Sequence, residues 1–198
     1  MDNHLGSRVF LALFPDDKTL EATRDVVRSF KKEARNLRFL NLDQMHITLQ
    51  FLGNSVSNDS IEYISEELER HKSELSPQII RLTDVMFGFP GQRIPKLIYW
   101  DVESTNELKT FTRDVHGFIK DLELPDINPQ KDHAKLIHHM TLGRVKNSAS
   151  KSLAKNIKSI IQGINIDKVE FKASELAFVS STLTNTGPVY RFIKKVSF

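Results

Sequence analysis

The sequence predicts an α+β protein with largely antiparallel sheets, flanking helices and a loose internal duplication. Segments with strand-like and helix-like periodicity follow the order βαβα-ββα and then βα-ββ, and a four-residue motif occurs twice on expected strands. The chain has 198 residues, enough for one substantial core or for two small lobes sharing one. We therefore expect residues 1–198 to form a single domain.

The first half of the chain alternates strands with amphipathic helices. The expected elements are a buried strand at 8–14, a helix capped at Pro15-Asp16-Asp17 and reaching Ala34, a strand at 45–52 ended by Gly53-Asn54, and a helix capped at Asn58-Asp59. Each helix has an apolar stripe at helical spacing, so we expect both to pack against a sheet.

The second half is richer in strands. We expect strands at 78–87 and 96–102, a helix capped by Ser104 and broken at Leu124-Pro125, an exposed loop at 125–135, a strand at 138–145, a helix at 150–163, and strands at 168–179 and 189–196. Exposed loops commonly border functional sites, which makes the 125–135 segment notable.

Composition narrows the class of protein. The net charge is +3 from 28 basic and 25 acidic residues, which permits an anionic partner without indicating one. The absence of cysteine excludes disulfides, thiol nucleophiles and cysteine-bound zinc. The N-terminus has no signal-peptide pattern, and no stretch approaches the ~20 apolar residues of a membrane span. We expect a cytoplasmic, monomeric protein with no obligatory protein partner.

The most informative feature is a tetrapeptide that occurs twice, as His46-Ile-Thr-Leu49 and as His139-Met-Thr-Leu142. Side chains alternate between the faces of a strand, so each histidine shares a face with the threonine two positions later. Gln50 extends this face in the first copy and becomes a candidate for substrate binding. The pattern predicts a cleft lined by two imidazoles and two hydroxyls.

Such a cleft suits a reaction that removes one proton and supplies another. Histidine titrates near neutral pH, so His46 and His139 can serve as an acid and base pair. The hydroxyls of Thr48 and Thr141 can donate to anionic oxygens. The four groups together can surround a tetrahedral phosphate, and the scheme requires neither a metal nor a cofactor.

These residues resemble those of the two-histidine phosphoesterase superfamily, and in particular its bacterial and archaeal RNA 2′,3′-cyclic phosphodiesterases, historically called 2′-5′ RNA ligases. The resemblance runs nearly end to end and rests on RVFLALFP from Arg8, HITLQFLG from His46, FGFP from Phe87, HMTLGRV from His139 and GPVY from Gly187. It implies two lobes of antiparallel sheet flanked by helices, with the motifs lining a cleft along a pseudo-twofold axis.

The resemblance also implies an activity. Proteins of this branch hydrolyse 2′,3′-cyclic phosphate ends of RNA to a 2′-phosphate, with reverse 2′-5′ ligation as a further activity. By position, His46 corresponds to the proton donor and His139 to the proton acceptor. Arg144 matches an arginine that contacts phosphate, although strict alternation places it opposite His139, so a twist, bulge or strand end must bring it to the site. Where the family often has Arg-Pro, this chain has Ile137-His138.

Other residue groups have simpler interpretations. A metal cluster at His133, His138 and His139 is disfavoured because adjacent strand residues face opposite ways and no carboxylate pattern completes the ligands. Among the aromatic residues, Phe89 is the best candidate for stacking on a nucleobase because it lies in a turn. The remaining aromatic candidates for stacking are better explained as core residues: Phe51, Phe87, Trp100 and Tyr190. The basic residues are better explained as solvated: Lys31, Lys32, Arg35, Arg38, Lys194 and Lys195.

Two alternatives to RNA end hydrolysis remain open. The same site can act on a small cyclic nucleotide or an ADP-ribose cyclic phosphate. Alternatively, the chain is an RNA-binding protein with a vestigial site, against which the intact motifs argue. Cleft width and surface charge separate the first two hypotheses, and these depend on the tertiary structure.

Overall fold

The computed structural model describes residues 6–127, 137–147, 150–165, 169–185 and 187–198. The strands are β1 (Ser7–Leu13), β2 (Leu37–Phe39), β3 (Ile47–Val56), β4 (Gln78–Phe87), β5 (Leu97–Val102), β6 (His139–Val145), β7 (Val169–Ala173), β8 (Glu175–Thr184) and β9 (Gly187–Ser197). The α-helices are α1 (Asp17–Ser29), α2 (Asn58–His71), α3 (Asn106–Asp121) and α4 (Lys151–Gln162). Short 3₁₀ helices are η1 (Lys31–Glu33), η2 (Leu42–Gln44) and η3 (Lys72–Glu74).

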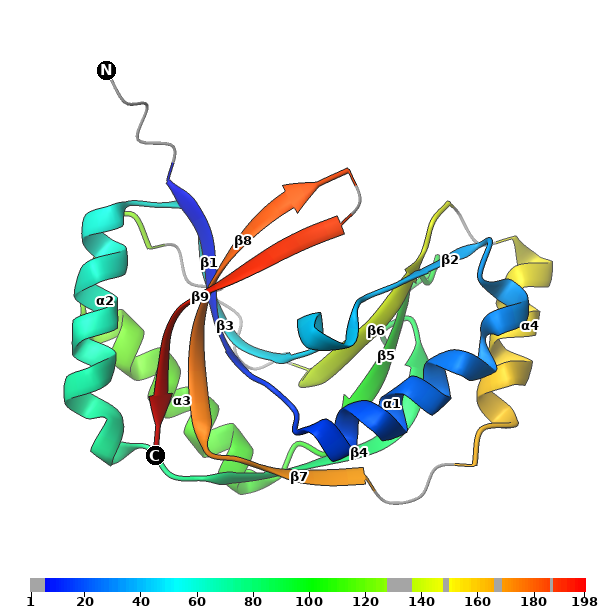
Figure 1. Cartoon of the computed structure of the whole chain (residues 1–198), viewed down its shortest axis with the longest axis horizontal. Helices are drawn as coiled ribbons and strands as arrows, with labels where there is room; N and C mark the ends of the chain where they lie inside the picture. The colour runs from blue at the N-terminus through cyan, green and yellow to red at the C-terminus, as the bar shows by residue number, and fades with distance from the viewer. Residues whose placement is uncertain (1–5, 128–136, 148–149, 166–168, 186) are drawn as a thin grey trace.

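The strands form one curled antiparallel sheet with two halves (Figure 1). Its order is β7-β4-β5-β6-β3-β1-β8-β9, with β2 paired to β6. The two halves meet between β3 and β6, where Ile47 pairs with Met140. These are the second residues of the two tetrapeptides, so the junction brings both motifs to the centre of the molecule. The α+β class with antiparallel sheet and flanking helices is confirmed.

The helices cross between the halves of the sheet. Helix α1 follows β1 in the chain but contacts β7, and α3 follows β5 but contacts β3. Figure 1 shows α2 and α3 beside the β1–β3 half, and α1 and α4 beside the β4–β6 half. The halves are therefore tied together by helices as well as by the sheet.

The helix caps match the sequence expectation closely. The side chain of Asp16 accepts a hydrogen bond from the Thr19 amide at 2.8 Å, as predicted for a helix cap. The other caps are Ser57, Thr105 and Ser150. Ser57 lies one residue before the predicted cap Asn58, and Thr105 lies one residue after the predicted cap Ser104. Helix α1 ends at Ser29, and η1 rather than α-helix leads toward Ala34.

Two strand predictions were wrong, and one strand was missed. Strand β3 continues through Gly53-Asn54 to Val56, because β1 pairs alongside it as far as Ser7. The segment predicted as one strand from 168 is two, separated at Ser174, because β7 pairs with β4 while β8 pairs with β1 in the other half. Strand β2 was not predicted, since three residues are too few to establish a period. Of the expected 125–135 loop, residues 128–135 lie outside the described residues.

The core contains two of the four aromatic residues that the sequence analysis assigned to it. Trp100 is fully buried, and its indole N–H donates to Thr23 Oγ1 at 3.1 Å. Phe87 packs against the same cluster of buried residues. Buried aromatic side chains supply much of the apolar area that stabilises a fold. Their core assignment is thereby confirmed for Trp100 and Phe87.

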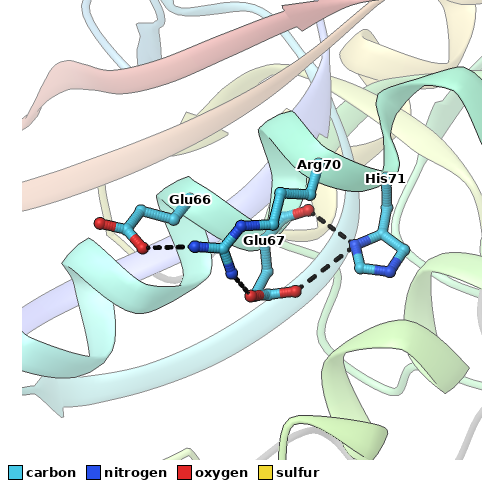
Figure 2. A network of polar contacts seen from close by, with 4 residues as sticks. All are labelled: Glu66, Glu67, Arg70 and His71. Atoms are coloured by element: carbon cyan, nitrogen blue, oxygen red, sulfur yellow. Dashed lines mark hydrogen bonds and ion pairs between the residues drawn. The ribbon is translucent and has the colours of Figure 1, made fainter.

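One network of polar contacts on α2 joins four residues of that helix (Figure 2). Arg70 forms ion pairs with Glu66 at 2.9 Å and with Glu67, and the Nδ1 of His71 contacts the Glu67 carbonyl at 2.9 Å. Pairs at these helical spacings stabilise a helix by a few tenths of a kcal/mol each. None of the four residues lines the central cavity, so this network is structural.

Among the described helices, none combines the length and apolar character needed to cross a membrane. The expected cytoplasmic location and monomeric state stay predictions.

Candidate active site

A cavity of about 600 Å³ lies where the two halves of the sheet meet. It is lined by Arg8, Phe10, Arg38, Leu40, His46, Thr48, Phe51, His139, Thr141, Arg144, Ser181, Leu183, Gly187, Pro188 and Tyr190. The structure thus brings together five of the predicted site residues, namely both histidines, both threonines and Arg144. The described lining contains three arginines and no carboxylate, which favours an anionic ligand.

A β-bulge reverses the alternation of β3 just after the first motif. On β1, Ala12 pairs with Thr48 and the preceding residue, Leu11, pairs with Gln50. Leu49 is therefore the extra residue on β3. Thr48 therefore faces the cavity, whereas Gln50 turns into the core and is 3% exposed. Phe51 lines the cavity in its place. The predicted face for Gln50 and Phe51 was wrong because the alternation was extended through the bulge.

A bulge at the equivalent position of β6 brings Arg144 to the site. Thr141 pairs with Tyr99 and Gly143 with the adjacent Ile98, so Leu142 is extra on β6. Arg144 thereby moves to the face of His139 and Thr141. The sequence analysis required a twist, bulge or strand end for Arg144 to reach the cavity, and a bulge is present. The corresponding bulge in the other half moved Gln50 away from the cavity.

Each histidine is oriented by its own backbone. His46 Nδ1 lies 2.7 Å from the Gln44 carbonyl, and His139 Nδ1 lies 2.8 Å from the Ile137 carbonyl. A carbonyl accepts only, so Nδ1–H donates in both residues and Nε2 is the nitrogen left for the cavity. Both rings thus present the same nitrogen, related by the pseudo-twofold repeat.

Aromatic rings hold the two imidazoles in place. His46 stacks on Phe10 with ring centroids 4.8 Å apart, and the Tyr190 ring meets it edge-on at 5.2 Å. Phe89 and Tyr99 contact the His139 ring at 5.0 and 5.4 Å. Phe89 packs beside His139 and is not among the residues that line the cavity, and its role in substrate stacking stays a prediction.

The environment disfavours the charged form of both site histidines. Burial lowers the pKa of His46 from 6.5 to about 4, although the hydrogen bond to Gln44 raises it, and the neighbouring His139 lowers it further. Burial also lowers the pKa of His139, opposed by the bond to Ile137, and the nearby Arg144 adds to the lowering. Without an anion in the cavity, the neutral imidazole is favoured at both positions.

Gln44 connects the first histidine to the β8–β9 hairpin. Its side-chain oxygen accepts from the Asn41 amide at 3.2 Å, and its Nε2 donates to the Pro188 carbonyl at 2.6 Å. Its own carbonyl accepts from His46 Nδ1. The hairpin that contributes Pro188 and Tyr190 to the cavity is therefore fixed to the same residue that orients the imidazole.

Sequence reasoning missed several contributors to the lining, among them two arginines and a tyrosine. Arg8 was quoted only within a longer stretch, and it lies with its guanidinium carbon 4.4 Å from the centre of the Phe51 ring. Arg38 was interpreted as solvated and Tyr190 as core. The three residues converge on the cavity through pairing of segments that are distant in the sequence, which no local pattern indicates.

The adjacent histidines of the second motif face opposite ways, as the alternation predicted. His138 is 2% exposed, and its Nε2 lies 2.9 Å from Thr112 Oγ1 and its Nδ1 3.2 Å from Ser104 Oγ. Burial lowers its pKa to about 4. His133 lies outside the described residues. Within the described ranges, no three or more histidine, aspartate or glutamate side chains are grouped so that they could share a metal ion.

Solved structures with a similar fold are known. No model of a known protein family matches the chain. TT0787 of Thermus thermophilus has a similar crystal structure, with a TM-score of 0.71 and 21% identity over 96% of this chain and 97% of that one. A crystal structure of a phosphoesterase gives a TM-score of 0.65 and 14% identity, covering 98% of each chain. The chain therefore shares its fold with these two structures over nearly its whole length.

Two relatives are similar to the chain over nearly its whole length. The chain is 25% identical over 198 residues to an RNA 2′,3′-cyclic phosphodiesterase of Thermotoga maritima, covering 96% of this chain and 95% of the relative. It is 27% identical over 190 residues to one of Methanocaldococcus jannaschii, covering 95% and 99%. The resemblance to RNA 2′,3′-cyclic phosphodiesterases is thereby confirmed.

Proposed function

We propose that this protein is a phosphodiesterase that opens 2′,3′-cyclic phosphates at RNA ends to give a 2′-phosphate. The observation that carries the proposal is the orientation of His46 and His139, each with Nδ1–H bound to a backbone carbonyl and Nε2 left for one cavity. The relatives named as RNA 2′,3′-cyclic phosphodiesterases support the substrate class.

The two imidazoles divide the proton transfers between them. Neutral His139 accepts a proton from water at Nε2 as the water oxygen attacks phosphorus, and protonated His46 donates from Nε2 to the 3′-oxygen as the P–O3′ bond breaks. The products are a 2′-phosphate and a 3′-hydroxyl, with the proton transferred from one histidine to the other. Exchange with solvent restores the starting state. Reverse 2′-5′ ligation follows by the same chemistry if a ribose 5′-hydroxyl replaces water.

The remaining cavity groups act on the phosphate itself. Thr48 and Thr141 line the cavity on the same faces as the histidines, so their hydroxyls donate to the non-bridging oxygens. Arg144 adds positive charge beside His139. These groups are fixed by the sheet before substrate binds, which reduces the reorganisation needed as charge shifts in the transition state.

The test is hydrolysis of an oligoribonucleotide ending in a 2′,3′-cyclic phosphate, in the presence of EDTA and with chromatographic mapping of the product isomer. His46→Ala and His139→Ala should each lower turnover at least about 100-fold. The double variant should turn over little more slowly than the slower of the two single variants, because both histidines act in one step. His71→Ala is the matched control, because this histidine lies on α2 away from the cavity.

Two results would contradict the proposal. One is a folded histidine variant that retains nearly the wild-type rate. The other is activity that EDTA abolishes and zinc restores, which indicates attack by a metal-bound hydroxide instead. RNA binding without hydrolysis would favour the alternative of a vestigial site.

A further inference from the structure

Two arginines face the cavity side by side from neighbouring strands. Arg38 on β2 is paired directly opposite Arg144 on β6, and both line the cavity. Side chains at directly opposite positions of an antiparallel pair start about 5 Å apart at Cβ. Two guanidinium groups therefore share one edge of the site.

Strand β2 is held close to β6 by its backbone. The Leu40 amide donates to the Leu142 carbonyl at 2.8 Å, and the Lys146 amide donates to the Asn36 carbonyl at 2.9 Å. Gly143 permits the approach, because a Cβ there would lie 2.7 Å from the Arg38 carbonyl oxygen. The position of Arg38 is thus fixed by the fold rather than by its own side chain.

Nothing in the described part of the chain neutralises this pair. Neither Arg38 nor Arg144 has an ion-pair partner among the described residues, and no described carboxylate lines the cavity. Like charges placed directly opposite each other destabilise a sheet. The guanidinium of Arg8 on the other half is also without a carboxylate, but it is already engaged by the Phe51 ring and by Asn54 Oδ1. The unneutralised pair is therefore available to an anionic ligand.

One phosphate does not account for both arginines. The cyclic phosphate must lie between the histidines, where Thr48, Thr141 and Arg144 already contribute to its binding. In an RNA chain the next negative charge is the phosphodiester on the 5′ side of the terminal nucleotide. We propose that Arg38, beside Arg144, binds this second phosphate, so that the site selects an RNA chain over a cyclic mononucleotide. This inference rests on the proposed function of the same cavity.

The experiment compares two dinucleotides that both end in a 2′,3′-cyclic phosphate. One has a natural phosphodiester between its nucleosides, and the other has an uncharged methylphosphonate at that position. The wild-type protein should hydrolyse the natural dinucleotide with a kcat/KM about 10-fold higher, as expected for a hydrogen bond to a charged group. The preference should weaken as salt is raised, because the guanidinium is exposed.

Arg38→Gln is the diagnostic variant, and it should reduce the preference to about twofold or less. Arg35→Gln is the matched control, because it removes the same charge from an exposed position that does not line the cavity. The control should retain the wild-type preference. Thermal unfolding should show both variants folded, with Arg38→Gln no less stable than the control since it removes a repulsive pair.

The outcomes separate this inference from the proposed function. Equal hydrolysis of the two dinucleotides by the wild type, or an unchanged preference in Arg38→Gln, would overturn the role of Arg38 while leaving end hydrolysis intact. A parallel preference loss in Arg35→Gln would show a general effect of net charge and would also overturn it. Hydrolysis of neither dinucleotide by the wild type would overturn the proposed function itself.

Discussion

Phosphate bound between the two histidines should raise the pKa of His46 from about 4 toward neutrality. A single negative charge about 4 Å from the imidazole contributes ~4 kcal/mol at the effective dielectric constant of ~20 that describes protein sites. That energy shifts the protonation equilibrium about a thousandfold. Substrate binding therefore creates the protonated histidine that the reaction needs, whereas the free site favours neutral rings.

The pH dependence of turnover follows from the sign of these shifts. The reaction requires one protonated and one neutral imidazole, so its rate is highest between the two pKa values of the pair. Both pKa values are lowered in the free protein. The profile of kcat/KM, which reports the free enzyme, should therefore peak below pH 6.5. The profile of kcat, which reports the substrate complex, should peak at higher pH.

The direct assay is NMR titration of the His46 ring with and without inorganic phosphate, using an equal concentration of chloride as the control. We expect the free ring to remain neutral down to about pH 5 and its titration to move to higher pH only with phosphate. A His46 ring that titrates near 6.5 without phosphate, or that phosphate does not affect, would refute the reasoning.

Four further substitutions test three features of the structure. Thr48→Val and Thr141→Val should each lower kcat/KM by about 10- to 150-fold, measured by steady-state kinetics, because one hydrogen bond to a charged oxygen is lost; wild-type constants in both variants would exclude a phosphate-binding role. Gln50→Met should raise the free energy of unfolding, measured with denaturant, by about 1 to 2 kcal/mol and leave turnover unchanged, because both polar atoms of the buried amide lack a hydrogen-bond partner among the described residues. If the variant folds but loses turnover, Gln50 belongs to the site after all. Gly143→Ala should destabilise the protein by about 1 to 3 kcal/mol, because the added Cβ would displace β2. Gly117→Ala is the control and should not destabilise the protein, because its added Cβ meets open space. Equal thermal stability of the two alanine variants would contradict the close approach of β2.

The sequence was most informative where structure depends on neighbouring residues. Helix caps and apolar stripes are local, so all four α-helices were predicted, with the cap at Asp16 placed correctly. The histidine–threonine pairs were also local, since residues two apart on a strand share a face. The duplicated motif thus identified four of the residues that line the cavity.

Local alternation was insufficient beyond each motif. The bulges at Leu49 and Leu142 arise from pairing with β1 and β5, and each moves the following residues to the opposite face. Gln50 left the predicted site for this reason and Arg144 entered it. The alternation of residues within one strand does not show where its pairing with a neighbouring strand will leave a residue unpaired.

The electrostatic character of the site is likewise a property of the assembled sheet. Arg8 and Arg38 reach the cavity from β1 and β2, which lie on opposite sides of the junction between the halves. The lowered pKa of His46 comes mainly from its burial. The chain by itself therefore determined which groups perform acid and base chemistry. Tertiary pairing decided which charges surround them, because burial and cross-strand neighbours are set only when distant segments pack together.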